Sequence, residues 1–346
     1  MKNRLTTYSL LLTAVFLFIV IEACRKSDLF KNTTPVSFNI PQDFPPTVYN
    51  FQENPLNQQT IALGRQLFYE GRLAKDGITS CGSCHNQIAA FTSYDHDLSH
   101  GYNNSHTRRN APVLFNLAWY KEFQWDGSSN TLESITLKHI NSPLDMGGTM
   151  TDAVRRIETD TLYKRLFREA YGSERVTSQR ILKALTQFMV QMVSANSKYD
   201  KVKRGEAIFT PNEQIGYQVF QINCSSCHKE PLFTDFSYRN IGLTMDHHLE
   251  DKGRMEVRGN RSDSLKFRVP TLRNIMASSY YAHDGRFPLV RNVINHYRTG
   301  IVASSTLDPF LTNGIDLTDA DVDYLISFLR TLADSTLLTN PNYSQP

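Results

Sequence analysis

Two short stretches of the chain carry the residues with the most specific chemistry. They are Cys81-Gly-Ser-Cys84-His85 and Cys224-Ser-Ser-Cys227-His228. In each stretch two cysteines lie three positions apart and a histidine follows at once, which is the pattern that covalent attachment of a c-type haem requires. Both thiols can reach the haem vinyl groups from one helical turn, and the imidazole can ligate the iron. The spacing therefore predicts two covalently bound haem c groups.

The same thiols are compatible with two other kinds of site. Together, two Cys-x-x-Cys pairs can bind one zinc ion, and each pair alone can act as a thioredoxin-like redox centre. Neither alternative explains a histidine directly after both pairs. Haem attachment is therefore the favoured interpretation of these four cysteines.

The N-terminus indicates export from the cytoplasm. Two basic residues near the start precede an apolar run over Leu10–Ile21, which is short for a membrane span and typical of a signal-peptide core. Cys24 follows Ala23 as in bacterial lipoprotein signals, although Glu22 departs from the usual pattern. We expect cleavage after Ala23 and a periplasmic protein held to a membrane only by a lipid on Cys24. An ordinary secretory signal is the alternative.

The composition is typical of a globular protein that does not bind nucleic acid. At 346 residues the chain can form two domains with separate cores, and 40% of its residues are hydrophobic while 21% are charged. A formal net charge of +3 gives no case for a nucleic-acid partner.

The surroundings of the two cysteine motifs form an internal repeat. The matching features are Gly64–Phe68 with Gly216–Phe220, Phe91-Thr92 with Phe233-Thr234, and Arg109-Asn110 with Arg239-Asn240. Their common order predicts two copies of one helical domain. In each copy the glycine would let a helix approach closely, and the phenylalanine would pack on the haem.

Helix signals and the segments between them divide the chain. A capping box at Thr210–Glu213 opens one helix, Ser178–Val193 forms another, and a third begins at Thr318. No window alternates with period two, so we predict an all-α fold of two c-type cytochrome domains with short irregular or β-ribbon insertions. The expected parts are a signal peptide over 1–23, a tether or irregular arm over 24–55, an N-terminal domain over 56–200, a C-terminal domain over 201–335 and a tail over 336–346.

With these motifs the chain resembles the bacterial di-haem cytochrome c peroxidases and their relative MauG, from about residue 60 to residue 332. Besides the haem motifs, the resemblance rests on Ser-His-Gly at 99–101, Arg-Arg-Asn-Ala-Pro at 108–112, Phe-Gln-Trp-Asp-Gly at 123–127, Ser-Pro-Leu-Asp-Met at 142–146, Val-Pro-Thr-Leu-Arg-Asn at 269–274 and His-Asp-Gly-Arg at 283–286. The resemblance implies a peroxide-reacting haem in the N-terminal domain, with His85 as proximal ligand. It implies an electron-transfer haem in the C-terminal domain, with His228 as proximal ligand.

The resemblance also assigns a loop histidine to the first haem. In many members such a histidine blocks the open side of the peroxide-reacting haem until the enzyme is reduced. His100 matches that position, and His96 and His106 are nearby alternatives.

Two further residues match family positions with roles in the reaction. Trp125 matches the tryptophan that relays electrons between the haems, and Asp145 stands where a glutamate usually moves a proton between the two peroxide oxygens. Aspartate is one methylene shorter than glutamate, which reduces its reach. The chain also departs from the family with Ile135 in place of a glutamine and Ser128 in place of an arginine.

The resemblance implies a calcium ion between the domains. Its matching positions are Asn110, through the side chain, and Ser278 and Tyr280, through backbone carbonyls. Carbonyl ligands do not depend on the side chain, so the residue types at these positions permit the site.

The distal position of the second haem differs from that of the usual peroxidases. Counting from His283, their methionine is replaced by Tyr297, as in MauG, and His296 is the neighbouring alternative. Methionine raises a haem potential, whereas a phenolate stabilises oxidised iron. Adjacent helix residues point about 100° apart, so we expect one of the two to face the iron. A five-coordinate haem remains a further alternative.

The leading functional interpretation is a peroxidase, an oxidoreductase that reduces hydrogen peroxide to water with electrons from cytochrome c or another small redox protein. One alternative is a MauG-like enzyme that oxidises a partner protein or an organic substrate through high-valent haem. Another is a non-catalytic di-haem electron-transfer or sensing cytochrome. A homodimer is compatible with each of them.

Overall fold

Threonine caps determine where two of the long helices begin. Helix α9 (Pro211–Asn223) starts after Thr210, whose side chain accepts a hydrogen bond from the backbone N–H of Glu213. Helix α12 (Asp319–Arg330) starts after Thr318 with the same capping box. Both predicted starts are confirmed.

The computed structural model describes residues 33–346. The expected signal peptide and the expected lipid anchor at Cys24 therefore lie outside the described residues. Among the described residues, no helix is both long enough and apolar enough to cross a bilayer.

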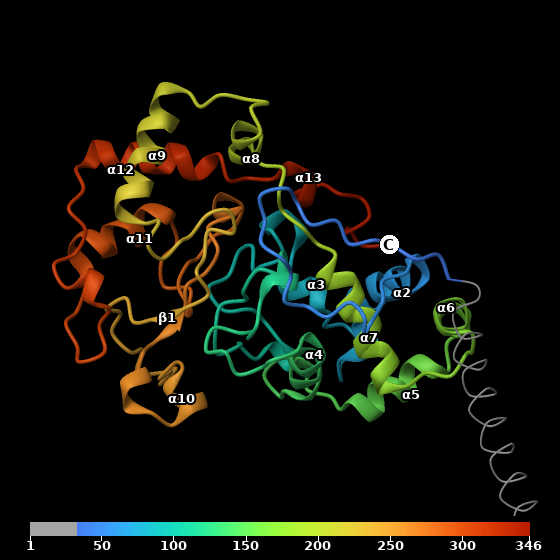
Figure 1. Cartoon of the computed structure of the whole chain (residues 1–346). Helices are drawn as coiled ribbons and strands as arrows, with labels where there is room; N and C mark the ends of the chain where they lie inside the picture. The colour runs from blue at the N-terminus through green and yellow to red at the C-terminus, as the bar shows by residue number, and fades with distance from the viewer. Residues whose placement is uncertain (1–32) are drawn as a thin grey trace, which may run out of the picture.

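Helices dominate both halves of the molecule, as the all-α prediction requires. The first half contains α2 (Gln58–Phe68), α3 (Cys81–Cys84), α4 (Leu132–Asn141), α5 (Met150–Glu158), α6 (Thr161–Tyr171) and α7 (Ser178–Val190). The second half contains α8 (Lys198–Lys203), α9, α10 (Met255–Arg258), α11 (Val290–Asn295) and α12, and α13 (Ser335–Leu338) follows. The described sheet is a single antiparallel pair, β1 (Tyr238–Arg239) with β2 (Phe267–Arg268). Figure 1 shows the two halves side by side, with α2 to α7 in one and α9 to α12 in the other.

The internal repeat predicted from the sequence is present as two equivalent helix pairs. In the first half α2 crosses α7 at Gly64, where an added Cβ would overlap the backbone carbonyl of Ala184. In the second half α9 crosses α12 at Gly216, where it would overlap the carbonyl of Tyr324. The two glycines therefore permit the close helix approach that the sequence suggested.

Replacing Gly216 by alanine tests this helix contact. The atoms that a Cβ would meet belong to the backbone of α12, so the helices must separate, and we expect a loss of about 1–3 kcal/mol in the free energy of unfolding. Thermal or denaturant unfolding of the variant measures the loss. Gly148→Ala is the matched control, because its Cβ would meet no atom closer than 3.5 Å. A Gly216→Ala protein as stable as the control would contradict the expectation.

Each half has its own buried aromatic cluster. Phe68 of α2 packs against Phe188 of α7 with ring centroids 5.3 Å apart, and Phe220 of α9 packs against Phe328 of α12 at 5.1 Å. All four rings are fully buried. The halves are therefore two domains with equivalent cores.

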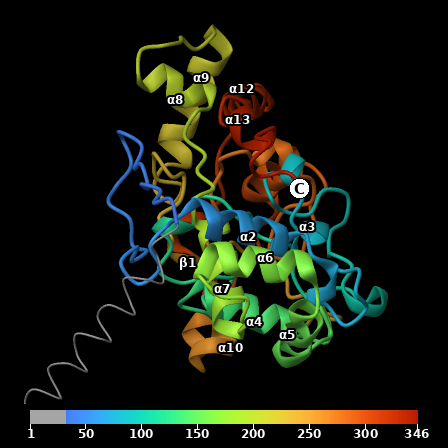
Figure 2. The ribbon, with the colours of Figure 1, turned by 90° about the vertical axis from the view of Figure 1, so that its right-hand side faces the viewer.

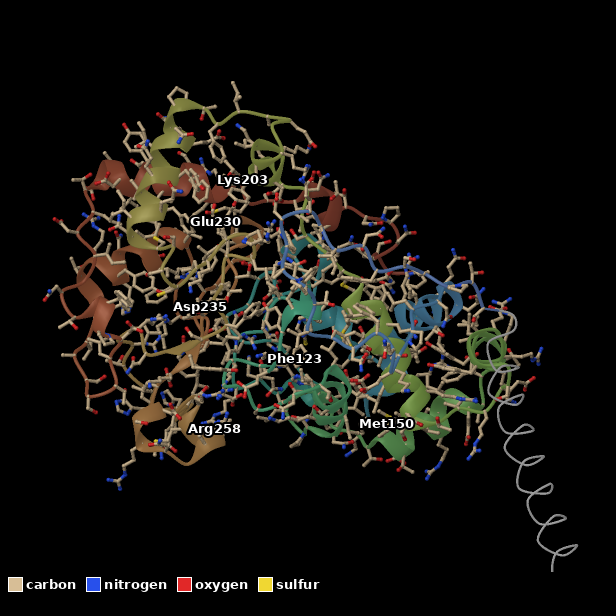
Figure 3. All side chains as sticks on the ribbon, viewed as in Figure 1. Phe123, Met150, Lys203, Glu230, Asp235 and Arg258 are labelled. Carbon is tan, nitrogen blue, oxygen red and sulfur yellow. The ribbon has the colours of Figure 1, made fainter. Side chains whose placement is uncertain are left out.

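Buried ion pairs hold the two domains together. Arg109 of the first domain reaches Asp251 of the second domain at 2.5 Å and Asp126 of its own domain at 2.6 Å. At the edge of the same boundary, Arg258 of α10 pairs with Glu122 at 3.4 Å. Figure 3 labels Arg258 on α10.

The segment before α2 lies on the first domain. The Trp119 indole N–H donates to the carbonyl of Pro45 at 2.7 Å, and the Phe44 ring meets the Trp119 ring edge-on at 5.0 Å. The Val48 backbone N–H donates to the Ala118 carbonyl at 2.9 Å. These contacts make residues 33–57 an irregular arm on the surface of this domain, as Figure 2 shows.

Candidate functional site

The first cysteine motif forms a single helical turn. Helix α3 (Cys81–Cys84) begins after Ser80, which forms a reciprocal capping box with Ser83. His85 follows the turn, and its Nδ1 lies 2.7 Å from the Phe91 carbonyl. A carbonyl can only accept, so Nδ1 carries the proton and Nε2 keeps the lone pair that a metal ligand needs. Burial lowers the pKa of His85 to about 4, which favours the neutral, ligating form.

The second cysteine motif has the same arrangement. Cys224 ends α9, and the Nδ1 of His228 lies 3.2 Å from the Phe233 carbonyl and 3.1 Å from the Pro270 carbonyl. Phe91 and Phe233 both adopt left-handed backbone conformations, with φ of 58° and 54°. The repeat therefore extends to the turn that fixes the orientation of each imidazole.

An apolar cavity adjoins the second motif. Its lining includes Cys224, Cys227 and His228, together with Tyr297 and Trp125. Two thiols, a histidine with a free Nε2 and an apolar wall are the donor set and surroundings that a c-type haem requires. The residues present therefore fit this group.

Tyr297, rather than His296, faces this cavity. Both residues begin a single turn of π-helix over His296–Gly300, and such turns often occur at functional sites. The Tyr297 side chain lines the cavity, whereas Nε2 of the buried His296 donates to the Ile241 carbonyl at 2.8 Å. Burial and the nearby Cys224 and Cys227 thiols raise the pKa of the Tyr297 phenol. An iron ion would act in the opposite direction and favour the phenolate.

Three loop histidines cluster beside the first motif. The His100 ring lies 4.6 Å from that of His96 and 4.5 Å from that of His106. The His100 carbonyl lies 3.7 Å from the Cys84 sulfur. The ring Nδ1 of His100 is buried and has no hydrogen-bond partner among the described residues. By contrast, the His96 ring pairs with Asp95 at 2.6 Å. His100 is therefore central in the cluster and has an unused ring nitrogen.

Asp145 has a partner that the sequence reasoning missed. Its Oδ2 lies 3.4 Å from Nδ1 of His139, which belongs to α4. Burial raises the pKa of Asp145, but the hydrogen bond and charge of His139, with help from Ser142, outweigh that effect and lower it. The carboxylate is close enough to the first motif to influence the pKa of both His85 and Cys84. The sequence signal that could have revealed this pairing is a histidine on a helix shortly before Asp145.

A network of polar side chains continues from His139 to Ser128, a position where the sequence departs from the family pattern. Nε2 of His139 lies 3.4 Å from the Gln124 amide nitrogen, and the Gln124 amide oxygen accepts from Ser128 at 2.5 Å and from Lys138 at 3.1 Å. Ser128, His139 and Asp145 therefore belong to one polar network.

Trp125 lies where the two domains meet. Its indole N–H donates to the Asn110 carbonyl at 2.9 Å, and its own carbonyl accepts from the Arg268 backbone N–H of β2 at 2.7 Å. The side chain also lines the cavity beside the second motif. This is a suitable place for an aromatic relay between two haems.

The residues expected to bind calcium are partly assembled. The Asn110 amide nitrogen lies 3.4 Å from the Tyr280 carbonyl and 2.8 Å from the Asp97 carbonyl. The Ser278 carbonyl accepts from the Tyr281 hydroxyl at 2.7 Å. A calcium ion here would require the opposite orientation of the Asn110 amide, with its oxygen toward the ion.

Comparison with known proteins agrees with this architecture. The family model described as di-haem cytochrome c peroxidase matches residues 58–208. A methylamine utilization protein MauG from Methylorubrum extorquens is 30% identical over 302 residues, covering 86% of this chain and 85% of the relative. A cytochrome c551 peroxidase from Nitrosomonas europaea is 34% identical over 235 residues, covering 67% and 70%.

A solved structure shares both the fold and the sequence pattern. It is a MauG-like protein associated with microbial copper homeostasis, with a TM-score of 0.84 and 30% identity over 90% of this chain and 99% of the other. The repeated haem motif, the two equivalent domains and these likenesses lead to one conclusion. The chain belongs to the di-haem cytochrome c peroxidase and MauG family.

Proposed function

We propose that this protein is a peroxidase that reduces hydrogen peroxide to water at the first motif, with electrons from a small redox protein that enter at the second. Haem c would be attached through Cys81 and Cys84 and through Cys224 and Cys227. The observation that carries the proposal is the repeated arrangement in which Nδ1 of His85 and of His228 is tied to a carbonyl. Each Nε2 is thereby available to an iron ion.

The residues around the first motif would handle the protons. A haem held there by Cys81, Cys84 and His85 would supply an iron centre that can exchange electrons with peroxide. Asp145 would take the proton from the inner peroxide oxygen and return it to the outer, leaving oxygen, as one acid/base residue can do both. His139 holds the Asp145 carboxylate in its ionised form, ready to accept the first proton.

The remaining site residues would control access and electron transfer. His100, with an unused ring nitrogen beside Cys84, would cap the open side of the first haem until the protein is reduced. Trp125, at the domain boundary, would carry electrons from the second haem to the first.

The position of Tyr297 supports a second candidate function. A phenolate ligand stabilises oxidised iron, which suits a MauG-like enzyme that oxidises a partner protein or an organic substrate. The structure favours this candidate only through the Tyr297 side chain in the cavity and the engagement of His296 elsewhere. The two candidates share the same first haem site.

Three finer features of the proposal concern export, the lipid anchor and calcium. Export and a lipid anchor at Cys24 rest on the N-terminal pattern. A calcium ion at Asn110, Ser278 and Tyr280 rests on the match of these positions to the family and on the proximity of the Asn110 side chain to the Tyr280 carbonyl, 3.4 Å away.

Haem analysis together with turnover tests the proposed function. The purified protein should contain two haems per chain, and the double variant Cys81→Ser/Cys84→Ser should contain one. Reduced cytochrome c should be oxidised only when peroxide is added, and the double variant should lose this activity because its first motif lacks both thiols. His247→Ala, at an exposed histidine, is the control for surface changes. A protein with two haems that oxidises no donor, even after reduction, would refute the peroxidase function.

A further inference from the structure

The segment that follows the last helix of the second domain crosses back to the first domain. After α7, which closes the first domain, the chain enters the second domain at α8, where Tyr199 is 2% exposed and packs in the core of that domain. After α12, which closes the second domain, the chain continues to Leu337, which is 1% exposed and belongs to the core of the first. Figure 1 shows the C-terminus beside α2 of the first domain.

The linker between α7 and α8 and the segment that follows α12 meet at one buried carboxylate. Asp334 is fully buried, and its Oδ2 accepts the backbone N–H of Ala195 at 2.9 Å and of Asn196 at 3.0 Å. Ser194 adds its hydroxyl at 3.2 Å. Asp334 therefore ties the beginning of the C-terminal segment to the linker at Ser194–Asn196.

The C-terminal segment ends against the part of the first domain that carries the haem motif. The Gln87 amide donates to the carbonyls of Leu337 at 3.0 Å and Asn340 at 2.9 Å. The Tyr69 hydroxyl donates to the Tyr343 carbonyl at 2.6 Å, and the Tyr69 ring occupies the space that a Cβ on Gly82, inside the haem motif, would need. The segment thus contacts residues on both sides of His85.

The Tyr343 ring buttresses the turn that orients His85. It meets the Phe91 ring at 6.4 Å and the Phe188 ring at 6.4 Å, both edge-on. Phe91 holds a left-handed conformation with φ of 58°, which a phenylalanine keeps only when its surroundings impose it. That conformation directs the Phe91 carbonyl to Nδ1 of His85.

The second domain repeats this arrangement with Tyr199. Its ring meets Phe233 edge-on at 4.8 Å, and its hydroxyl donates to Glu230 at 2.6 Å. Phe233 has φ of 54° and its carbonyl faces Nδ1 of His228. Figure 3 places Glu230 in the second domain with Lys203 of α8.

We propose that Tyr343 and Tyr199 are positioning residues that hold the two proximal histidines through the neighbouring phenylalanine turns. Tyr343 acts on His85 from the segment that follows the second domain, and Tyr199 acts on His228 from α8 of its own domain. The role assigned to His85 and His228 as iron ligands rests on the proposed function. The cross-domain buttress itself rests only on the described contacts. The proximal geometry of the first haem is therefore set partly by a segment that follows the second domain.

The test compares Tyr343→Ala, Tyr343→Phe and Tyr199→Ala in the full-length protein. For each haem the midpoint potential and the ferric paramagnetic-resonance signal are measured after haem content is confirmed. Tyr343→Ala should shift the potential and signal of the first haem and leave the second unchanged, and Tyr199→Ala should do the reverse. Tyr343→Phe keeps the ring and should match the wild type. Unchanged haems in Tyr343→Ala, or equal changes at both haems, would overturn the proposal.

Hydrogen exchange provides a measurement that does not depend on haem. The turn after His85 is closed by the Asn86 N–H to Thr92 carbonyl bond at 3.1 Å and the Phe91 N–H to Asn86 carbonyl bond at 2.8 Å. In Tyr343→Ala these amides should exchange about tenfold faster, while those of the Phe233 turn should not change. Absence of any local change would reject the buttress. A protein that shows the change but binds no haem would instead reject the proposed function.

Discussion

Replacing Asp145 by asparagine is expected to lower kcat/KM for hydrogen peroxide by about 10²–10⁴, the usual contribution of a positioned acid/base group. Asparagine keeps the size of the side chain but can neither accept nor return the proton. Haem content and the optical spectra of the variant should match the wild type, because Asp145 is not an attachment residue. Steady-state kinetics with a reduced cytochrome c measure the effect.

His139→Gln separates the role of the carboxylate from that of its partner. Burial raises the pKa of Asp145, and the His139 imidazole counteracts this effect. Without the imidazole the pKa of Asp145 should therefore rise. Because the reaction begins with an ionised Asp145, the acidic limb of the kcat/KM profile should move to higher pH. Glu169→Gln, at an exposed surface carboxylate, is the control. An Asp145→Asn enzyme with unchanged kcat/KM would remove Asp145 from the reaction.

Replacing Tyr297 by methionine is expected to raise the midpoint potential of the second haem by on the order of 100 mV or more, since axial ligands set haem potentials over a range of about 0.8 V. A neutral thioether favours reduced iron, whereas a phenolate favours oxidised iron. Spectroelectrochemical titration of the wild type and the variant measures the change. Electron flow from a donor cytochrome into this haem should become more favourable, and oxidised states of the protein should become shorter-lived.

Tyr297→Phe and His296→Gln complete this experiment. Phenylalanine keeps the aromatic ring but cannot ligate, so it separates loss of the phenol from gain of the thioether. His296→Gln keeps a donor for the Ile241 carbonyl and should leave the second haem as it is. If the His296 variant changes the spectrum and the Tyr297 variants do not, the distal ligand is His296.

Local signals in the sequence were sufficient to predict the scaffold. The capping threonines fixed the starts of α9 and α12, and the two glycines marked the helix crossings, because caps and close approaches depend on adjacent residues. The helix expected over Ser178–Val193 ends three residues earlier, at Val190. Helix ends depend on tertiary contacts, which the periodic pattern does not contain.

The missed features depend on contacts between distant or irregular segments. His139 meets Asp145 because the chain turns back after α4, and a helical pattern does not reveal that return. Tyr343 reaches Phe91 across 252 positions of sequence, and the tail that carries it has no periodic pattern. The motif positions indicated where the proposed haems would be attached, whereas residues proposed to act on them, such as His139 and Tyr343, meet their partners only through the tertiary fold.

The return of the C-terminal segment to the first domain after Asp334 bears on how the repeat could have arisen. It also bears on whether the two domains could be separated by cutting the chain. Two similar halves suggest duplication of a one-haem module, but a cut between α7 and α9 would no longer release such a module. The first half would lack Leu337 from its core and the Tyr343 ring from the Phe91 turn, whereas the second half would keep Tyr199 when the cut lies before α8. The first domain thus depends on a segment that follows the second, so the continuous chain, rather than a piece cut between the domains, supplies the complete first domain.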